Sequence, residues 1–173
     1  MRVLGVDPGY AACGLALLDH TPSRCRALQL ETVRTSPTEP LSARLHTVWR
    51  RAGAIITASD PPPAVLAMEA QARAQEGARQ RGTISFEALA VRQVVGILQA
   101  LAWQHGLAFL EVEPATWRGC FGLRVTAEKA QVQRAVRALF GWTGRLSEHA
   151  AEAAGVGLAG ARYFSSYGTA ARK

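Results

Sequence analysis

Hydrophobic positions in the first 34 residues fall into three runs separated by turn residues. The first run, Met1 to Val6, stops at Asp7-Pro8-Gly9, where proline and glycine favour a turn. A second run begins near Cys13, and the alternation from Cys25 to Arg34 predicts a third strand. Because the links between the runs are short, we expect these strands to form an antiparallel meander.

Helical and strand patterns alternate in the next part of the chain. Apolar residues recur at helical spacing from Leu41 to Ile56, and the composition from Ile84 to Trp103 predicts a long helix. The short apolar runs Ala64 to Met68 and Leu107 to Val112 predict buried strands. With the meander, these two strands make a mixed five-stranded sheet.

Two further helices complete the pattern, one opening near Thr126 and one covering Glu148 to Tyr163. Gly155 and Gly157 are expected to weaken the last helix by roughly 1 kcal/mol each relative to alanine. The order of elements predicts an α/β fold with helices on both faces of the sheet.

The chain shows no internal repeat, and its 173 residues suffice for one core without disulfides. We therefore expect a single domain over residues 1–164. Ser165 to Lys173 is predicted to be a basic, frayed tail. Gln71 to Thr83, rich in Gln, Arg, Ala and Gly, is predicted to be a loop or an irregular helix start.

The net charge favours a polyanionic partner, because 20 Lys and Arg against 13 Asp and Glu give +7 at pH 7. An arginine-rich solvated surface would give the same balance. The three cysteines are widely separated and form no ligand cluster. No uninterrupted apolar run reaches the roughly 18 residues of a membrane span, and the start has no signal-like apolar region. These features predict a cytoplasmic protein without a membrane partner.

Two carboxylates stand at the ends of predicted buried strands. Asp7 follows the first strand and Glu69 follows the run Ala64 to Met68. If these strands are neighbours, the carboxylates converge at one edge of the sheet. Converging carboxylates repel one another unless a hard cation such as Mg²⁺ or Mn²⁺ neutralises them. Taken singly, Asp7 could instead be a turn residue before Pro-Gly, and Glu69 a solvated carboxylate at a strand end.

The last predicted helix opens with three ligand-capable side chains among small residues. His149 and Glu152 are three residues apart, and Glu148 and Glu152 are four apart, so either pair lies on one helix face. Small neighbours let this helix approach the sheet closely. The alternative is an ordinary helix start in which the macrodipole favours acidic residues.

Four motifs in order resemble the RuvC family of Holliday-junction resolvases. They are Gly5-Val-Asp7-Pro-Gly9 with Gly14 beyond it, Met68-Glu69, Ala127-Glu128-Lys129-Ala-Gln131-Val132, and His149-Ala-Ala-Glu152-Ala-Ala. Each motif alone is weak, but their order and spacing match over nearly the whole chain.

The resemblance implies a ribonuclease-H-like fold and a homodimer. It also implies two-metal phosphodiester hydrolysis, with Mg²⁺ or Mn²⁺, at symmetric positions of a four-way DNA junction in recombination and repair. The family's helicase complex, RuvA and RuvB, would be a partner. By position, the metal ligands would be Asp7, Glu69, His149 and Glu152.

Two basic residues also match positions of the family. Lys129 corresponds to a basic residue near the scissile phosphate, and Arg118 falls where the family often has lysine. Both would contact DNA and offset negative charge on the phosphate.

The chain departs from the family pattern in three places, one of which is a Gln71 to Thr83 region longer than usual. Glu152 stands where the family usually has aspartate, and the extra methylene predicts a relaxed metal preference, toward Mn²⁺. No aromatic residue directly follows Glu69, where some members place a phenylalanine that inserts into the junction. Phe86 or an arginine such as Arg73 could replace it.

Other functions are compatible with parts of this pattern. The Glu152 change could leave a catalytically weak junction-binding protein, and an RNA-processing nuclease can share the fold. A sugar-kinase or actin-like ATPase also carries Asp-x-Gly after a strand, but that architecture needs two such domains and a longer chain.

Overall fold

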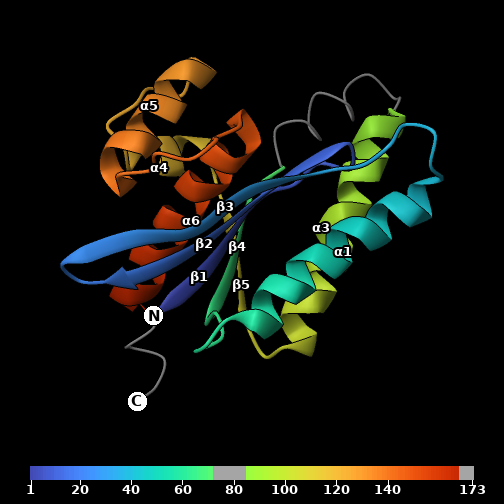
Figure 1. The fold of residues 1–173 in the computed structure, drawn as a ribbon, viewed down its shortest axis with the longest axis horizontal. Helices are drawn as coiled ribbons and strands as arrows, with labels where there is room; N and C mark the ends of the chain where they lie inside the picture. Colours follow the sequence, from blue (N-terminus) through green and yellow to red (C-terminus); the bar gives the residue numbers. More distant parts are fainter. Residues whose placement is uncertain (72–84, 168–173) are drawn as a thin grey trace.

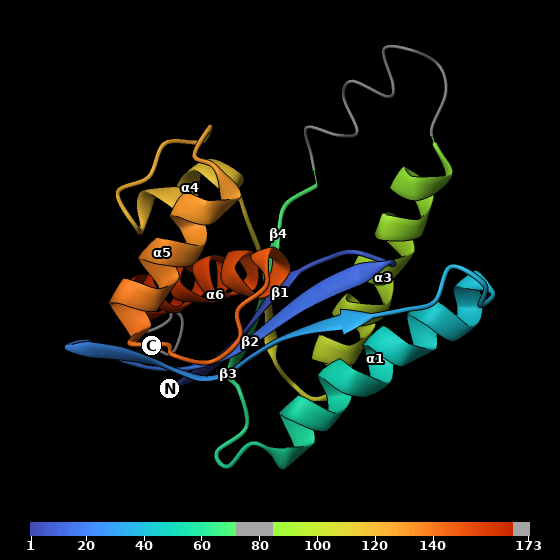
Figure 2. The same cartoon turned by 45° about the horizontal axis from the view of Figure 1, so that its top comes forward.

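The computed structural model describes residues 1–71 and 85–167, in which a mixed sheet lies between two layers of helices (Figures 1 and 2). The first three strands form an antiparallel meander, and the last two extend the sheet in parallel beside the first. This confirms the predicted mixed five-stranded sheet. In spatial order the strands are β3 (Arg24–Arg34), β2 (Ala12–Thr21), β1 (Arg2–Asp7), β4 (Val65–Glu69) and β5 (Ala108–Val112).

Helices cover both faces of the sheet, as predicted (Figure 1). One face carries α1 (Leu41–Ala58) and α3 (Phe86–Gln104). The other carries α4 (Pro114–Gly119), α5 (Lys129–Phe140) and α6 (Glu148–Tyr167).

The boundaries of α5 differ from the sequence prediction. The helix begins at Lys129, not near Thr126, because Glu128 caps it and closes a capping box with Gln131. In that box the Glu128 backbone N–H donates to Gln131 Oε1 at 2.8 Å. The short helix α4 was not predicted, since it is too short to show a helical period.

Helix α6 is longer than the sequence predicted. It continues through Tyr167, past the predicted end at Tyr163 and the predicted start of the tail at Ser165. The Ser166 hydroxyl donates to the Arg162 carbonyl oxygen at 3.0 Å, so a residue with turn propensity continues the helix. Residues 168–173 lie outside the described part of the chain, as do residues 72–83 of the predicted loop and residue 84, the predicted start of the next helix.

Strand alternation assigns each side chain of β1 to one of two apolar layers. Val3 packs with α6, whereas Leu4 and Val6 pack with α1 and α3. The same alternation places Gly5 and Asp7 on the α6 face. In β4, Ala67 packs with α6, so Glu69 lies on that face too.

Helix α6 lies directly against the sheet backbone. Except for Glu152, every residue from Ala150 to Ala161 is buried. A Cβ at Gly5 would collide with the Ala153 carbonyl oxygen, and one at Gly14 with the His149 carbonyl oxygen. The close approach therefore depends on glycine in the strands.

We expect Gly5→Ala to lower the free energy of unfolding by at least about 2 kcal/mol, because the added methyl group must push α6 off the sheet. Urea denaturation measures this loss. The matched control is Gly53→Ala in α1, whose Cβ would lie at an ordinary 3.6 Å from Leu101 Cδ1. The control should gain up to about 1 kcal/mol from helix propensity. Equal stability of the two variants would show that α6 does not need this close contact.

Candidate metal centre

The ends of β1 and β4 bring Asp7 and Glu69 to the same edge of the sheet. The strands are parallel and Val6 pairs with Met68, so the next residue of each strand is Asp7 or Glu69. Both side chains lie on the α6 face. This is the convergence that the strand ends predicted.

Helix α6 begins at the same edge and adds two ligand-capable side chains. His149 Nδ1 lies 2.7 Å from Asp7 Oδ2, at hydrogen-bonding distance. Each of Asp7, His149 and Glu152 offers a ligand atom, and these atoms lie within 4.8 Å of one another. The predicted spacing on one helix face thus places His149 and Glu152 over the end of β1.

Glu69 lies outside this group of three but is coupled to it electrostatically. Burial, followed by the charges of Asp7 and Glu152, raises the pKa of Glu69 to about 7. Burial and the Asp7 charge also raise the pKa of Glu152. The hydrogen bond to Asp7 raises the pKa of His149. All three shifts in pKa favour the protonated side chain. The cluster therefore carries more negative charge than the nearby positive groups neutralise.

The donor set has the chemistry of a divalent metal site. It combines carboxylate oxygens with one imidazole nitrogen, a set that suits Mg²⁺ or Mn²⁺. A bound cation would also relieve the repulsion that raises the carboxylate pKa values. Asp7, His149, Glu152 and Glu69 therefore fit such an ion in both ligand type and electrostatics.

Glu148 is directed toward Lys129 and His149. Its Oε2 lies 2.9 Å from Lys129 Nζ and its Oε1 lies 3.6 Å from His149 Nε2. This pair holds Lys129 at the rim of the cluster, where its side chain is 65% exposed. The ammonium group is therefore accessible to an anionic ligand.

Arg118 faces the cluster from α4. Its Nη2 lies 3.5 Å from Glu152 Oε1, and its guanidinium carbon lies 4.1 Å from the centre of the Trp117 ring. The Arg118 side chain is only 15% exposed. In this position the Arg118 guanidinium neutralises the Glu152 carboxylate. The predicted contact between Arg118 and DNA stays a prediction.

Trp117 was missed by the sequence analysis. It is fully buried beside the cluster, on a helix too short to show a period. Its only sequence signal is a large aromatic residue directly before Arg118, on a segment that follows a buried strand.

Phe86 lies near the same edge of the molecule. Its side chain is 58% exposed and its ring meets Tyr10 edge-on at 6.0 Å between centroids. Tyr10 follows the turn after Asp7 and also packs under Arg44. The role of Phe86 in a junction remains a prediction, and Arg73 lies outside the described residues.

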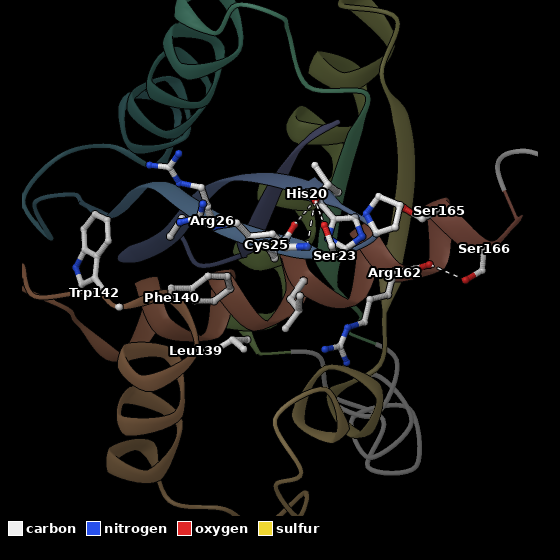
Figure 3. A pocket seen from close by; sticks show the side chains of 16 residues that line it. His20, Ser23, Cys25, Arg26, Leu139, Phe140, Trp142, Arg162, Ser165 and Ser166 are labelled. Atoms are coloured by element: carbon white, nitrogen blue, oxygen red, sulfur yellow. Dashed lines mark hydrogen bonds between the residues drawn. The ribbon is translucent and has the colours of Figure 1, made fainter.

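A separate cavity of about 1020 Å³ lies at the other end of the sheet. It is lined by the β2–β3 hairpin and the C-terminal ends of α5 and α6 (Figure 3). In Figure 3 the guanidinium groups of Arg26 and Arg162 point to different sides and do not converge. None of the four clustered residues lines this cavity, so it is not part of the metal centre.

A mixed sheet with this strand order and an acidic cluster at its carboxyl edge is the arrangement expected of a nuclease with a ribonuclease-H-like fold. The family model described as crossover junction endodeoxyribonuclease RuvC matches residues 3–159. The chain belongs to the RuvC family of Holliday-junction resolvases, whose members are metal-dependent nucleases. The predicted family, fold and enzyme class are confirmed.

Named relatives and solved structures agree with this assignment. The crossover junction endodeoxyribonuclease RuvC of Heliobacterium modesticaldum is 32% identical over 80% of each chain. The enzyme of the same name from Saccharophagus degradans is 28% identical over 90% of this chain and 84% of its own. The structure of Thermus thermophilus RuvC with a Holliday junction substrate matches with a TM-score of 0.76 and 22% identity, covering 98% of each chain. This last likeness shows the fold.

The raised pKa of Glu69 predicts a pH-dependent stability without divalent metal. Between pH 4.5 and 7 the folded chain holds a proton on Glu69 that the unfolded chain releases, so this group's contribution falls as pH rises. Glu69→Gln cannot ionise and should be more stable than wild type at pH 8 but similar at pH 4.5. Thermal unfolding with a chelator, across this range, measures the difference. A difference that does not change with pH would contradict the electrostatic coupling.

Proposed function

We propose that this chain resolves four-way DNA junctions by paired, symmetric nicks, in homologous recombination and DNA repair. Two Mg²⁺ or Mn²⁺ ions would be held by Asp7, Glu69, His149 and Glu152. The observation that carries the proposal is the convergence of Asp7, His149 and Glu152 within 4.8 Å, with Glu69 on the adjoining strand end. Membership of the resolvase family supplies the substrate class.

Bound ions would supply an activated water and stabilise the leaving 3′-oxygen. The protein's own residues set the geometry for this reaction. The 2.7 Å hydrogen bond between Asp7 and His149 fixes the orientation of both side chains. The exposed ammonium of Lys129 faces the solvent side, where a phosphate would lie, and offsets its negative charge.

The position of Glu152 favours a working centre over a catalytically weak junction-binding protein. Despite its extra methylene, a carboxylate oxygen of Glu152 reaches the same group as Asp7 and His149. The longer side chain still supports the proposed tolerance for Mn²⁺. Comparing a four-way junction, a plain duplex and an RNA substrate distinguishes resolvase activity from an RNA-processing nuclease.

We further propose a homodimer that uses the outer face of α3. By length and composition alone, this helix could cross a membrane. Its most apolar 18-residue window has a mean hydropathy of 1.2, but only 28% of the window is buried. The sequence analysis considered only uninterrupted apolar runs. It did not identify α3 as a helix of this kind, because polar residues interrupt the apolar pattern of α3. Mostly buried core helices of soluble proteins meet the same criterion, and one such helix is weak evidence for a membrane span.

Six of the exposed residues of α3 follow a heptad-like spacing. These six residues form a stripe of mostly apolar or small side chains on the outer, exposed face of α3. We call it the α3 stripe, which consists of Phe86, Leu89, Gln93, Gly96, Ala100 and Trp103. Such a stripe fits the same stripe of a second copy, which would pair two active sites for the two nicks of a junction.

Further features belong to the same proposal. The branch-migration complex of RuvA and RuvB is the proposed partner, and the cytoplasm the proposed location. The basic net charge of +7 is consistent with work on DNA.

Replacing Asp7 with asparagine tests the metal centre. Asp7→Asn should slow cleavage of a synthetic four-way junction by roughly 1000-fold or more with Mg²⁺ or Mn²⁺, because it weakens both the metal ligand and the His149 hydrogen bond. The control is Asp19→Asn, a 43% exposed carboxylate at the other end of β2. Cleavage by Asp7→Asn at the wild-type rate would refute the assignment.

A charged residue in the α3 stripe tests the dimer. Leu89→Glu should shift the chain to a monomer in analytical ultracentrifugation and separate the two nicks in time, because it buries a charge in the interface. Leu139→Glu on α5 is the matched control, since Leu139 and Leu89 are 46% and 44% exposed. A Leu89→Glu variant that stays dimeric would exclude this face.

A further inference from the structure

We propose that Trp117 is a positioning residue of the metal centre, whose indole holds Arg118 against Glu152 and presents its N–H to Glu69. The inference rests on the proposed function of these carboxylates as metal ligands. Trp117 would act through its neighbours and would not touch the metal or the substrate.

The position of Trp117 is set by α6. The indole is fully buried, and a Cβ at Gly155 would lie 2.6 Å from Trp117 Cε3 and 2.9 Å from Phe121 Cε2. Gly155 therefore leaves the space that receives the ring. Because Gly155 follows Glu152 by about one helical turn, the indole lies directly beside the part of α6 that carries this carboxylate.

The other side of the position is set by the sheet. Glu69 pairs with Val112 at the end of β5, and α4 starts two residues later at Pro114. The Trp117 backbone N–H donates to the Glu113 carbonyl oxygen at 3.2 Å, and this hydrogen bond joins α4 to the end of β5. Trp117 is thus attached to the strand beside Glu69 and packed on the helix of Glu152.

The first link runs through Arg118. Its guanidinium lies over the Trp117 ring at 4.1 Å, with Nη2 directed at Glu152 Oε1 3.5 Å away. Its Nε is buried and has no hydrogen-bond partner in the described part of the chain. The aromatic plane therefore supports one face of the guanidinium, and removing it would loosen the partner of Glu152.

The second link runs through the indole N–H. Trp117 Nε1 is buried and makes no hydrogen bond of normal geometry to any described residue. Buried indole N–H groups usually have a partner, so this one is placed to donate. The acceptor at hand is the Glu69 carboxylate, whose pKa the indole lowers in opposition to the larger effects of burial and neighbouring charge.

These two links explain how Glu152 can act as a metal ligand at a position where the shorter side chain of an aspartate would have less freedom to move. Glu152 has one more rotatable bond than aspartate, and its carboxylate is held from outside by Arg118. Partners that orient metal ligands in this way typically change metal affinity by about 10-fold to 100-fold when they are removed.

Metal binding by the full-length chain tests the proposal directly. Trp117→Phe keeps a ring under Arg118 but loses the N–H, and should weaken Mn²⁺ binding by about 10-fold in isothermal titration calorimetry. Trp117→Leu loses both links and should weaken it further. Trp49→Phe on α1, where the tryptophan contacts His46, is the control and should bind as wild type.

Indole NMR gives a readout that a purely structural role would not change. In the chain labelled with ¹⁵N-tryptophan, the Trp117 N–H signal is the one missing from the folded Trp117→Phe variant. That signal should move when Mg²⁺ is added and when Glu69 is changed to glutamine without metal. The Trp49 signal should stay in place under both conditions.

The outcomes separate this proposal from the proposed function. Wild type that binds no Mn²⁺ would refute the metal centre itself. Wild type that binds Mn²⁺, with a folded Trp117→Phe that binds equally well and an indole signal unmoved by Glu69→Gln, would refute the positioning role alone. If Trp117→Leu fails to fold, the phenylalanine variant and the indole signal decide.

Discussion

The direct contact between α6 and the backbone of the central strands is the constraint on which the rest of the structure depends. At Gly5 of β1 and Gly14 of β2 no side chain stands between helix and sheet, so at these points α6 lies closer than ordinary side-chain packing would allow. This closeness brings His149 and Glu152 of the helix to Asp7 of the strand. A helix held farther away by ordinary side chains would leave the two halves of the cluster apart.

The same closeness creates the electrostatic problem that a metal ion would solve. Three carboxylates and an imidazole are crowded at a half-buried edge, where burial together with the charges of Asp7 and Glu152 raises the pKa of Glu69 to about 7. The protein compensates only in part, with Arg118 on Glu152 and with Lys129 paired to Glu148. The remaining excess of negative charge is what a divalent cation would bind.

Sequence reasoning predicted the parts of the site that follow from local rules. Strand ends predicted that Asp7 and Glu69 converge, and helical spacing placed His149 and Glu152 on one face. It did not predict Trp117, because its role depends on contacts between α4 and α6. Gly155 looked like a cost to helix stability, but it is the space in which the indole packs. Long-range packing of this kind leaves no periodic signal in a sequence.

The central claim is that Asp7, Glu69, His149 and Glu152 form one divalent-metal centre. A crystal soaked in Mn²⁺, with diffraction collected at the manganese absorption edge, tests it most directly. The account predicts one or two anomalous peaks between Asp7 and Glu152, at roughly 2.0–2.3 Å from their oxygens. Manganese bound elsewhere on the chain, with no peak at this edge of the sheet, would contradict it.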